Sequence, residues 1–434
     1  MRVVVSAYAC SPYKGSEYGV GWGWVQAAAR YHEIWVLTAA HNRPDIERRA
    51  TEAPEEFRRV QFCYVPHRLW YYRPTPFWEG VANCMLSKAM NLPYRLWQRK
   101  AYELGGKLHQ RIGFDLVHLL TYVGFRFPGH LWKLNIPFVW GPIGGLENTP
   151  WRLLPILGPR GCIYYAGRNV INSLHKRLLQ SPKWAFRKAR GGIIAATADM
   201  RDEIKRFYGE DSEVICEVGP LEEVATEHSR RELGEPLRIA WSGSHRLGKA
   251  LPLLLHALAR LADDVAWHLD VLGDGPCTPA WRAKAESLGM DGRCTWHGRL
   301  AREDAVALVH RAHVFVITSM IDLTSTVLLE ALSQGVPVIC PDHCGFADVV
   351  TADCGIKVPV VSPRQLAGDM TAAIAALAED EPRRQHLATG ALRRIRDFSW
   401  DQKARRLDTI YRRAATRGLA TPSGPPSEGA DVCA

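Results

Sequence analysis

One stretch decides the fold class: VFVITSMIDLTSTVLLEALSQGVPVI, which spans residues 314–339. It begins with an apolar run that predicts a strand ending near Thr318, and a short polar loop follows. An apolar helical run then stops at Gly335, before a second apolar run that suits a strand. Asp322 lies in the loop and Glu330 lies inside the helix. Such a junction offers unpaired backbone N–H groups and the positive end of a helix dipole, which suit a phosphate-bearing ligand.

The two carboxylates also have ordinary interpretations. A loop Asp commonly serves as a turn residue or helix cap, and a helical Glu commonly faces solvent. Glu330, however, lies between Leu329 and Ala331 in a helix that has little polar surface. We therefore expect its side chain to be half buried and to need a hydrogen-bonding partner, which a ligand hydroxyl would supply.

The composition is that of a globular protein with two or three domains. The chain has 434 residues, of which 47% are hydrophobic and 23% charged, so it is long enough for full cores. No apolar run approaches the roughly 18 residues of a membrane span, and the start MRVVVSAYAC is too short and strand-like for a signal peptide. We expect a cytoplasmic protein whose 11 scattered cysteines are reduced thiols.

The formal net charge of +10 is compatible with phosphorylated ligands and with attachment to an anionic membrane surface. We find no nucleic-acid recognition motif and expect no nucleic-acid partner. Cys340, His343, Cys344 and Cys354 form the one group that hints at a metal site. Their spacing fits no common zinc pattern, and Cys340 ends a predicted buried strand, so we predict no metal.

Strands and helices alternate along the chain in two series, which predicts an α/β protein with two parallel sheets. The first series begins with a strand, a glycine-rich loop at residues 14–21 and a helix at 22–30. Its strands are predicted at residues 3–6, 33–38, 60–65, 116–118, 137–140, 192–196 and 213–218. The second series has predicted strands at residues 237–242, 267–272, 294–297, 314–318 and 336–340.

These series define two Rossmann-like domains, over residues 1–220 and 237–400, with a linker at 221–236. An amphipathic helix is predicted over 401–415, and the Gly-, Pro- and Ser-rich residues 416–434 are expected to be disordered. Two such domains would face each other across a cleft at the carboxyl edges of their sheets, where ligands of open α/β sheets bind.

Residues 66–110 and 151–190 of the first domain mix aromatic with basic side chains. Segments of this kind can lie in a lipid headgroup layer, which would fit an acceptor embedded in a membrane. They can equally form an extended helical insert whose aromatic side chains fill the core of the first domain. The sequence leaves both interpretations open.

The segment around Glu330 resembles the donor-site signature of glycosyltransferase family 4, whose members transfer sugars from nucleotide donors with retention of configuration. That signature usually has Glu, seven residues, a second Glu, and then a small residue, Gly, Val or Thr, Pro and Val. Here Asp322 stands at the first position, and Gly335-Val-Pro-Val follows Glu330. Further pieces of the second domain match at familiar spacings: residues 237–243 with Lys249, and residues 271–275, 297–300, 311–319 and 398–401.

The resemblance implies the GT-B architecture, in which two Rossmann-like domains face a cleft and the last helix crosses back to the first, acceptor-side domain. It implies that Glu330 binds the ribose hydroxyls, Asp322 a hydroxyl of the transferred sugar, and Lys249 the leaving diphosphate. Asp322, Lys249 and a first-domain histidine, His118, would be the catalytic residues. Other donor contacts are implied at Gly243, Arg246, Arg299, Leu300, Ser325, Thr326, Val327, Gly15 and Ser16.

Two departures from the family pattern affect the expected site. Most members pair the lysine with an arginine just after the glycine of the first strand, where this chain has Ser244, so Arg246 is the nearest replacement. Many members also have a His-x-His pattern, of which only His118 is kept. Either His118 or Tyr122 lines the cleft, or the sugar contact is different. Asp322 is one methylene shorter than Glu, which predicts a different sugar or hydroxyl.

The resemblance therefore implies a retaining hexosyltransferase that needs no metal and no cofactor beyond its nucleotide-sugar co-substrate. The expected donor is a UDP- or GDP-sugar, and the expected acceptor is a glycan, glycolipid or small molecule of surface polysaccharide biosynthesis. We place the enzyme in the cytoplasm, with peripheral contact to an anionic membrane as an option. The alternatives are a nucleotide-sugar epimerase or hydrolase, and a nucleotide-sugar-binding protein that has lost catalysis.

Overall fold

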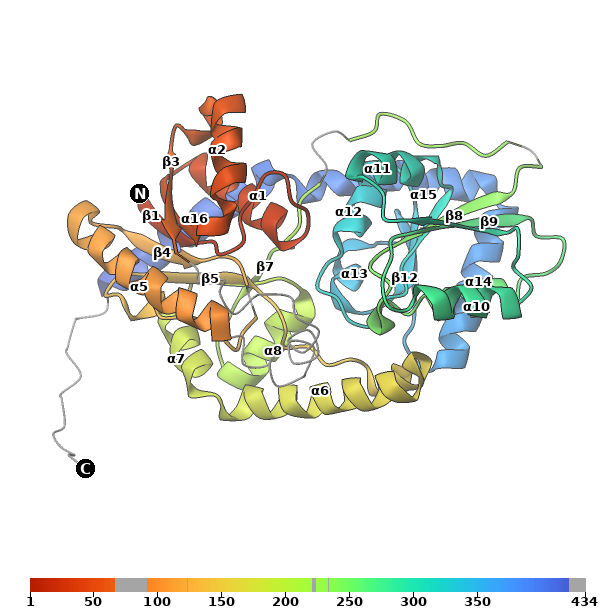
Figure 1. Ribbon diagram of the computed structural model, residues 1–434, viewed down its shortest axis with the longest axis horizontal. Helices are drawn as coiled ribbons and strands as arrows, with labels where there is room; N and C mark the ends of the chain where they lie inside the picture. The colour runs from red at the N-terminus through yellow and green to blue at the C-terminus, as the bar shows by residue number, and fades with distance from the viewer. Residues whose placement is uncertain (67–91, 123, 221–223, 233, 421–434) are drawn as a thin grey trace.

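The structure, a computed structural model, describes residues 1–66, 92–122, 124–220, 224–232 and 234–420. It contains a seven-stranded and a six-stranded sheet, and every strand pair within them is parallel. Figure 1 shows the two sheets side by side, each with its own helices. The predicted fold of two Rossmann-like domains is confirmed.

The first sheet has the strand order β3-β2-β1-β4-β5-β6-β7. Its strands are β1 (Arg2–Ser6), β2 (Glu33–Ala39), β3 (Val60–Val65), β4 (Leu116–Leu119), β5 (Phe138–Ile143), β6 (Ile193–Ala195) and β7 (Glu213–Val214). Helical segments of this half are α1 (Glu17–Ala29), η1 (Ala40–Asn42), α2 (Arg43–Glu52), η2 (Pro54–Phe57), α5 (Leu92–Ile112), η3 (Leu131–Lys133), η4 (Trp151–Leu157), α6 (Gly158–Leu178), α7 (Gln180–Lys188) and α8 (Ala198–Tyr208). The strand order reverses between β1 and β4.

The second sheet has the order β10-β9-β8-β11-β12-β13, with its reversal between β8 and β11. Its strands are β8 (Leu237–Ser242), β9 (Trp267–Leu272), β10 (Cys294–Gly298), β11 (Val314–Val316), β12 (Val338–Pro341) and β13 (Gly355–Val358). The helical segments are η5 (Leu247–Lys249), α9 (Leu251–Leu258), α10 (Thr278–Ser287), α11 (Arg302–Arg311), α12 (Thr326–Ser333), α13 (Cys344–Val349), α14 (Pro363–Glu379), α15 (Glu381–Arg394), η6 (Ile395–Phe398) and α16 (Trp400–Ala420). Ligands of open parallel sheets bind at such reversals.

The bounds of two predicted helices need correction, and one strand was not predicted. Helix α1 begins at Glu17 rather than at residue 22, so glycines of the predicted loop lie in its first turns. Gly21 packs closely there, since a Cβ on it would lie 2.1 Å from the Ala9 carbonyl oxygen. Strand β13 was not predicted, since it is short and includes a lysine. Helix α16 continues to Ala420, into the predicted tail, whose residues 421–434 lie outside the described chain.

Helix α16 runs from the second domain back onto the first. It packs against α1, β4 and β5, and Figure 1 shows it behind the strands of the first domain. Leu407, Ile410 and Tyr411 of α16 are buried in one cluster with Val3 and Val5 of β1. The C-terminal helix is thus part of the core of the first domain.

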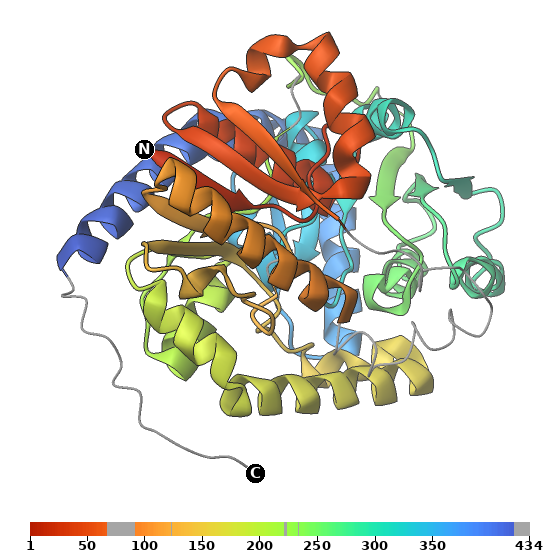
Figure 2. The ribbon, with the colours of Figure 1, turned by 60° about the vertical axis from the view of Figure 1, so that its left-hand side comes forward.

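A second connection between the halves was not predicted. The 3-10 segment η4, placed within the first domain by the sequence, buries Leu153, Leu154 and Leu157 in the same apolar cluster as Leu237 and Trp241 of β8. Helix α6 then returns along the lower edge of the molecule toward α7 (Figures 1 and 2). The expected boundary at residue 220 therefore does not separate the two cores.

The basic and aromatic segments are partly a core-filling insert and partly exposed. Tyr94 and Trp97 of α5 are buried in the first core, as the insert interpretation expects. Trp151 and Trp184 are 54% and 55% exposed, so these aromatic side chains do not fill a core. The rest of the earlier segment, residues 67–91, lies outside the described residues. None of the helices described is both long and apolar enough to cross a membrane.

Candidate active site

Two tight turns follow strands β8 and β9 at the carboxyl edge of the second sheet. Gly243, directly after β8, donates its N–H to the Leu272 carbonyl of β9 at 3.1 Å. Gly273 has φ of +109°, and a Cβ there would lie 2.0 Å from the Gly243 carbonyl oxygen, so a side chain would force the turns apart. This packing leads the chain from β8 into η5 and fixes the position of Lys249 at its end.

Lys249 and Asp322 meet as an ion pair in this place. Lys249 comes from the β8 side and Asp322 from the loop after β11. The Thr318 hydroxyl donates to the Lys249 carbonyl at 2.6 Å and accepts from Trp241 Nε1 at 2.9 Å, which ties the two strand ends together. Both charged side chains keep partial exposure, 22% and 24%, so a ligand can reach them.

The loop after Asp322 ends at the N-terminus of α12. Ser325 is the N-cap residue, and it makes no side-chain capping bond. The first backbone N–H groups of a helix have no partner within it, so those at Ser325, Thr326 and Val327 are available to an anion. The structure therefore brings together Lys249, Asp322 and a helix N-terminus, as the sequence predicts.

Glu330 lies one turn further along α12 and is 17% exposed on its side chain. Burial raises the pKa of its carboxyl group, and the neighbouring Arg302 opposes that rise. Arg302 Nε donates to Glu330 Oε1 at 3.3 Å. The expected half-buried position is confirmed, while the partner is an arginine that no sequence pattern singled out.

The remaining residues predicted to contact the donor follow strands β8 and β10. Arg246, at the N-cap of η5, and Arg299, directly after β10, are exposed. Leu300 packs in part against the apolar cluster that contains α12. Arg246 and Arg299 are thus cations that a ligand can reach from solvent.

The first domain contributes the loop before α1. Ser16, the N-cap residue of α1, has φ of +57°, which is costly for a residue with a Cβ. Gly15 beside it is exposed, and a Cβ at that position would meet nothing within 4 Å. Glu17 accepts the Tyr122 N–H at 2.6 Å, and burial raises the pKa of this carboxyl group.

A cavity of about 140 Å³ joins these pieces across the two domains. Ser16 and Glu17 line it from the first domain, and Asp322 and Thr326 line it from the second. Glu217, from the segment that leaves β7, lines it as well. The predicted cleft residues Ser16, Asp322 and Thr326 therefore share one cavity.

His118 does not line this cavity, contrary to the expectation that it would. The residue is 1% exposed. Its Nε2–H donates to the Gly141 carbonyl at 2.8 Å, and Nδ1 accepts from the Tyr411 hydroxyl at 2.7 Å. Burial lowers the pKa of His118 to about 4. Its neutral imidazole, bonded at both nitrogens, joins β4 to α16.

Tyr122, the other candidate, uses its ring against Tyr8 and Tyr94. Among the residues that the structure describes, neither His118 nor Tyr122 is found in the lining of the cavity. Glu17 and Glu217 line it without having been predicted there. Glu17 lies within the predicted glycine-rich loop, whereas Glu217 has no local sequence signal because it follows a strand of only two residues.

Comparison with known proteins agrees with this geometry. The family model described as "Glycosyl transferases group 1" matches residues 226–394. The matched residues form most of the second domain, which is therefore similar to glycosyltransferases of group 1. A D-inositol 3-phosphate glycosyltransferase of Corynebacterium efficiens is 29% identical over 332 residues, which is 70% of this chain and 72% of that protein. With the enzyme of the same name from Corynebacterium glutamicum, the match spans 56% of the relative's length.

Solved structures show the same fold for this glycosyltransferase. Sucrose-phosphate synthase from Thermosynechococcus elongatus aligns with a TM-score of 0.65 and 15% identity, over 97% of this chain and all of the other. Anabaena HepE, solved in complex with UDP-glucose, aligns with a TM-score of 0.56 and 14% identity over the same shares. Both likenesses concern the GT-B fold.

Proposed function

We propose that this glycosyltransferase moves a hexose from a nucleotide sugar to a glycan, glycolipid or small-molecule acceptor, with retention of anomeric configuration and without a metal ion. The observation that carries the proposal is the convergence of Lys249, Asp322 and the N-terminus of α12 at one sheet reversal. A lysine and a helix end together neutralise a leaving diphosphate, which is the main electrostatic demand of the reaction.

The proposed roles follow from position. Glu330 accepts hydrogen bonds from the ribose hydroxyls, with Arg302 holding its carboxylate. Asp322 accepts a hydrogen bond from the transferred sugar and stabilises positive charge at the anomeric carbon. Arg246 adds a second cation near the diphosphate, and Ser16 lines the cavity from the acceptor side.

The transfer step is proposed to occur on one face of the sugar. The bond between the anomeric carbon and the phosphate oxygen breaks as the bond to the acceptor oxygen forms. The acceptor proton passes to the leaving phosphate oxygen, so no separate base is required. Lys249 compensates the charge that develops on the diphosphate.

The donor and acceptor classes rest on the relatives. The complex of Anabaena HepE with UDP-glucose supports a UDP-sugar, with a GDP-sugar as the second choice. The relatives named D-inositol 3-phosphate glycosyltransferases support a hydroxylated acceptor that carries a phosphate. The basic segment that includes α6 and α7 suits a lipid-linked acceptor of surface polysaccharide synthesis at the inner face of the membrane.

A panel of UDP-, GDP-, ADP- and TDP-sugars tests this function. We expect one nucleotide class to stabilise the protein against heat and to be consumed in the presence of acceptor, with the product linkage keeping the donor's configuration. Release of an epimer or of free sugar alone would support the epimerase or hydrolase alternative. Stabilisation by a donor without any turnover would show a silent binding protein, and an inverted linkage would contradict retention.

We also propose that α6 and α7 contact an anionic membrane. Ile163, Val170, Leu174 and Leu178 are exposed on α6 at spacings of seven, four and four, which place them on one helix face. Residues 148–198 include nine Lys and Arg and no Asp or Glu. An exposed apolar helix face in a segment whose charged side chains are all basic is typical of a helix that lies on anionic lipid.

Sedimentation with vesicles tests this contact. We expect binding to phosphatidylglycerol vesicles at low salt and weaker binding to phosphatidylcholine vesicles. The pair Ile163→Glu and Leu174→Glu should abolish it, whereas Val361→Glu, at an exposed site of the second domain, should not. Equal sedimentation with and without anionic vesicles would refute the contact and leave the transferase function untouched.

A further inference from the structure

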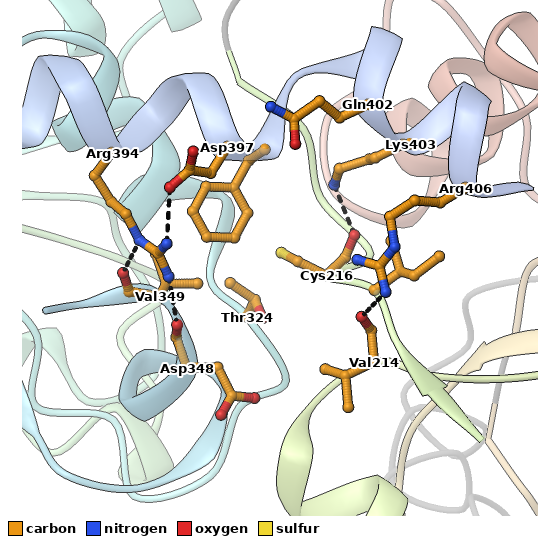
Figure 3. A pocket seen from close by; sticks show the side chains of 13 residues that line it. Val214, Cys216, Thr324, Asp348, Val349, Arg394, Asp397, Gln402, Lys403 and Arg406 are labelled. Carbon is orange, nitrogen blue, oxygen red and sulfur yellow. Dashed lines mark hydrogen bonds and ion pairs between the residues drawn. The ribbon is translucent and has the colours of Figure 1, made fainter. Parts of the chain in front are cut away.

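Glu217 lies on a segment that is fixed from behind. Lys403 of α16, 3% exposed, donates to the Cys216 carbonyl at 2.6 Å and also to the Val218 carbonyl. Trp24 of α1 donates its Nε1–H to the Glu217 carbonyl at 2.8 Å. Figure 3 shows Lys403 reaching the Cys216 carbonyl, with Thr324 facing the same pocket. Three consecutive carbonyls are therefore held by side chains of the first domain and α16.

The Glu217 side chain itself is held at one oxygen only. The residue is 6% exposed, and its Oε1 accepts the Thr324 N–H at 2.7 Å. Oε2 has no hydrogen-bond partner in the part of the chain that is described. Lys403, whose positive charge opposes a rise of the Glu217 pKa, donates to backbone carbonyls. Burial raises the pKa of Glu217 to about 7, and Asp322 adds to that rise.

A carboxylate in this state is costly as a purely structural element. An unpaired buried charged oxygen loses its hydration and gains nothing in return. An amide would accept the Thr324 N–H equally well without that cost. The unpaired oxygen belongs to a residue that lines the 140 Å³ cavity shared with Asp322, Ser16 and Thr326. Its missing partner is therefore to be sought in the ligand that fills this cavity.

We propose that Glu217 is a specificity residue of this glycosyltransferase, whose Oε2 accepts a hydrogen bond from a hydroxyl of the transferred sugar. Its Oε1 keeps the backbone of Thr324, and with it the loop of Asp322, in position. Glu217 of the first domain and Asp322 of the second then each accept a hydrogen bond from the transferred sugar. The site is therefore complete only when the two domains are closed. This inference rests on the proposed function, since it names a contact within that donor site.

The substitution Glu217→Gln tests the contact while keeping the acceptor for Thr324. With the donor found by the nucleotide-sugar panel, we expect kcat/KM to fall roughly 10- to 100-fold, the usual effect of losing a charge-assisted hydrogen bond. Glu210→Gln is the matched control, because Glu210 is also buried in the first domain but pairs with Arg190 outside the cavity. The control should keep wild-type kcat/KM, and both variants should keep the melting temperature within a few degrees.

Two further readouts separate sugar recognition from support of the loop. Because the ionised carboxylate is the acceptor, wild-type kcat/KM should rise with pH through about 7, and this rise should be absent in Glu217→Gln. Among monodeoxy forms of the donor, one should be a poorer substrate for the wild type and suffer little further loss in the variant.

The outcomes are distinct for the two proposals. Turnover by the wild type together with unchanged kcat/KM, pH profile and deoxy-sugar selectivity in Glu217→Gln overturns the role of Glu217 and leaves the transferase function standing. A loss of kcat/KM that is equal for every deoxy donor also overturns it, since that result describes a loop support. If the wild type turns over no nucleotide sugar, the proposed function fails and this inference fails with it.

Discussion

For Glu330, the sequence predicted the burial of the side chain but not the residue that pairs with it. Its apolar neighbours predict burial, and burial of a carboxylate predicts a partner. The structure supplies Arg302, 28 residues away at the start of α11. No local pattern indicates this pair, because α11 and α12 become neighbours only when the sheet reverses between β8 and β11. The arginine holds the carboxylate without burying it fully, which leaves an oxygen for a ligand.

Replacement of Glu330 by alanine should weaken donor binding while the fold survives. We expect roughly 100-fold lower affinity for the donor's nucleotide, since hydrogen bonds to a charged group contribute about 1.5–3 kcal/mol each. Removing a carboxylate whose pKa is raised by burial should cost little stability. Isothermal titration with the nucleotide checks the affinity, and Glu303→Ala, exposed on the neighbouring helix, is the control. Unchanged binding by a folded Glu330→Ala protein would refute the role of Glu330.

At the scale of elements, the strands that the sequence predicts to the residue are six residues long and rich in apolar side chains. Strands β3, β8 and β9 have the predicted bounds, because runs rich in apolar residues favour strands. Strand β13 at the edge of the sheet lacks such a run, with a lysine among its four residues. Partners outside the strand are just as hidden: His118 in β4 is held by Tyr411, 293 positions later.

We predict that His118 supports stability and not turnover. His118→Gln should cost about 1–2 kcal/mol of unfolding free energy at pH 7.5 through weakened hydrogen bonds, with kcat changed less than about threefold. The folded pKa of His118 is about 4, below its ordinary 6.5, so the unfolded state binds more protons and wild-type stability falls as pH drops from 6.5 toward 4. Urea titrations should therefore show the gap between the two proteins narrowing over that window. A constant gap with a large loss of kcat would restore the catalytic assignment.

The segment η4 precedes the second domain in the chain but packs in its apolar core. We therefore predict that η4 stabilises the second domain. Leu154→Ala should lower the free energy of unfolding by about 2–5 kcal/mol, as expected for a buried leucine that leaves a cavity. Trp151→Ala, in the same segment but 54% exposed, should change it by less than about 0.5 kcal/mol. Urea unfolding of both variants checks this. Equal stabilities would mean that η4 only rests on the second domain.

At the scale of the whole molecule, the two domains meet through hydrogen bonds from backbone N–H groups to carboxylates. Thr324 of the second domain donates to Glu217, and Ala198 at the start of α8 donates to Asp348 of α13 at 2.6 Å. Tyr165 of α6 also reaches the backbone of Gly248. Glu217 and Thr324 also line the cavity, so one of the contacts that join the domains is part of the candidate site.

Removing the Asp348 contact should therefore loosen the closed arrangement. Asp348→Ala takes a carboxylate from the N-terminus of α8, where it stabilises the helix by about 0.3–1 kcal/mol or more when partly buried. We expect a larger radius of gyration in small-angle scattering and roughly tenfold lower kcat/KM. Asp353→Ala, exposed in the same domain, serves as the control. Identical scattering and kinetics for both variants would show that Asp348 does not contribute to closure.

The sequence by itself determined the two parallel-sheet domains and the central residues of the candidate site. Apolar runs and the helix that stops at Gly335 are local, and Lys249, Asp322 and Glu330 all follow from the order of strands in one domain. Tertiary structure alone decided what crosses between domains: the burial of His118 by α16, the packing of η4 in the second core, and the position of Glu217 beside Asp322. The physical reason is that burial and the pairing of polar atoms depend on residues that are distant in the chain. A local sequence pattern does not identify those residues.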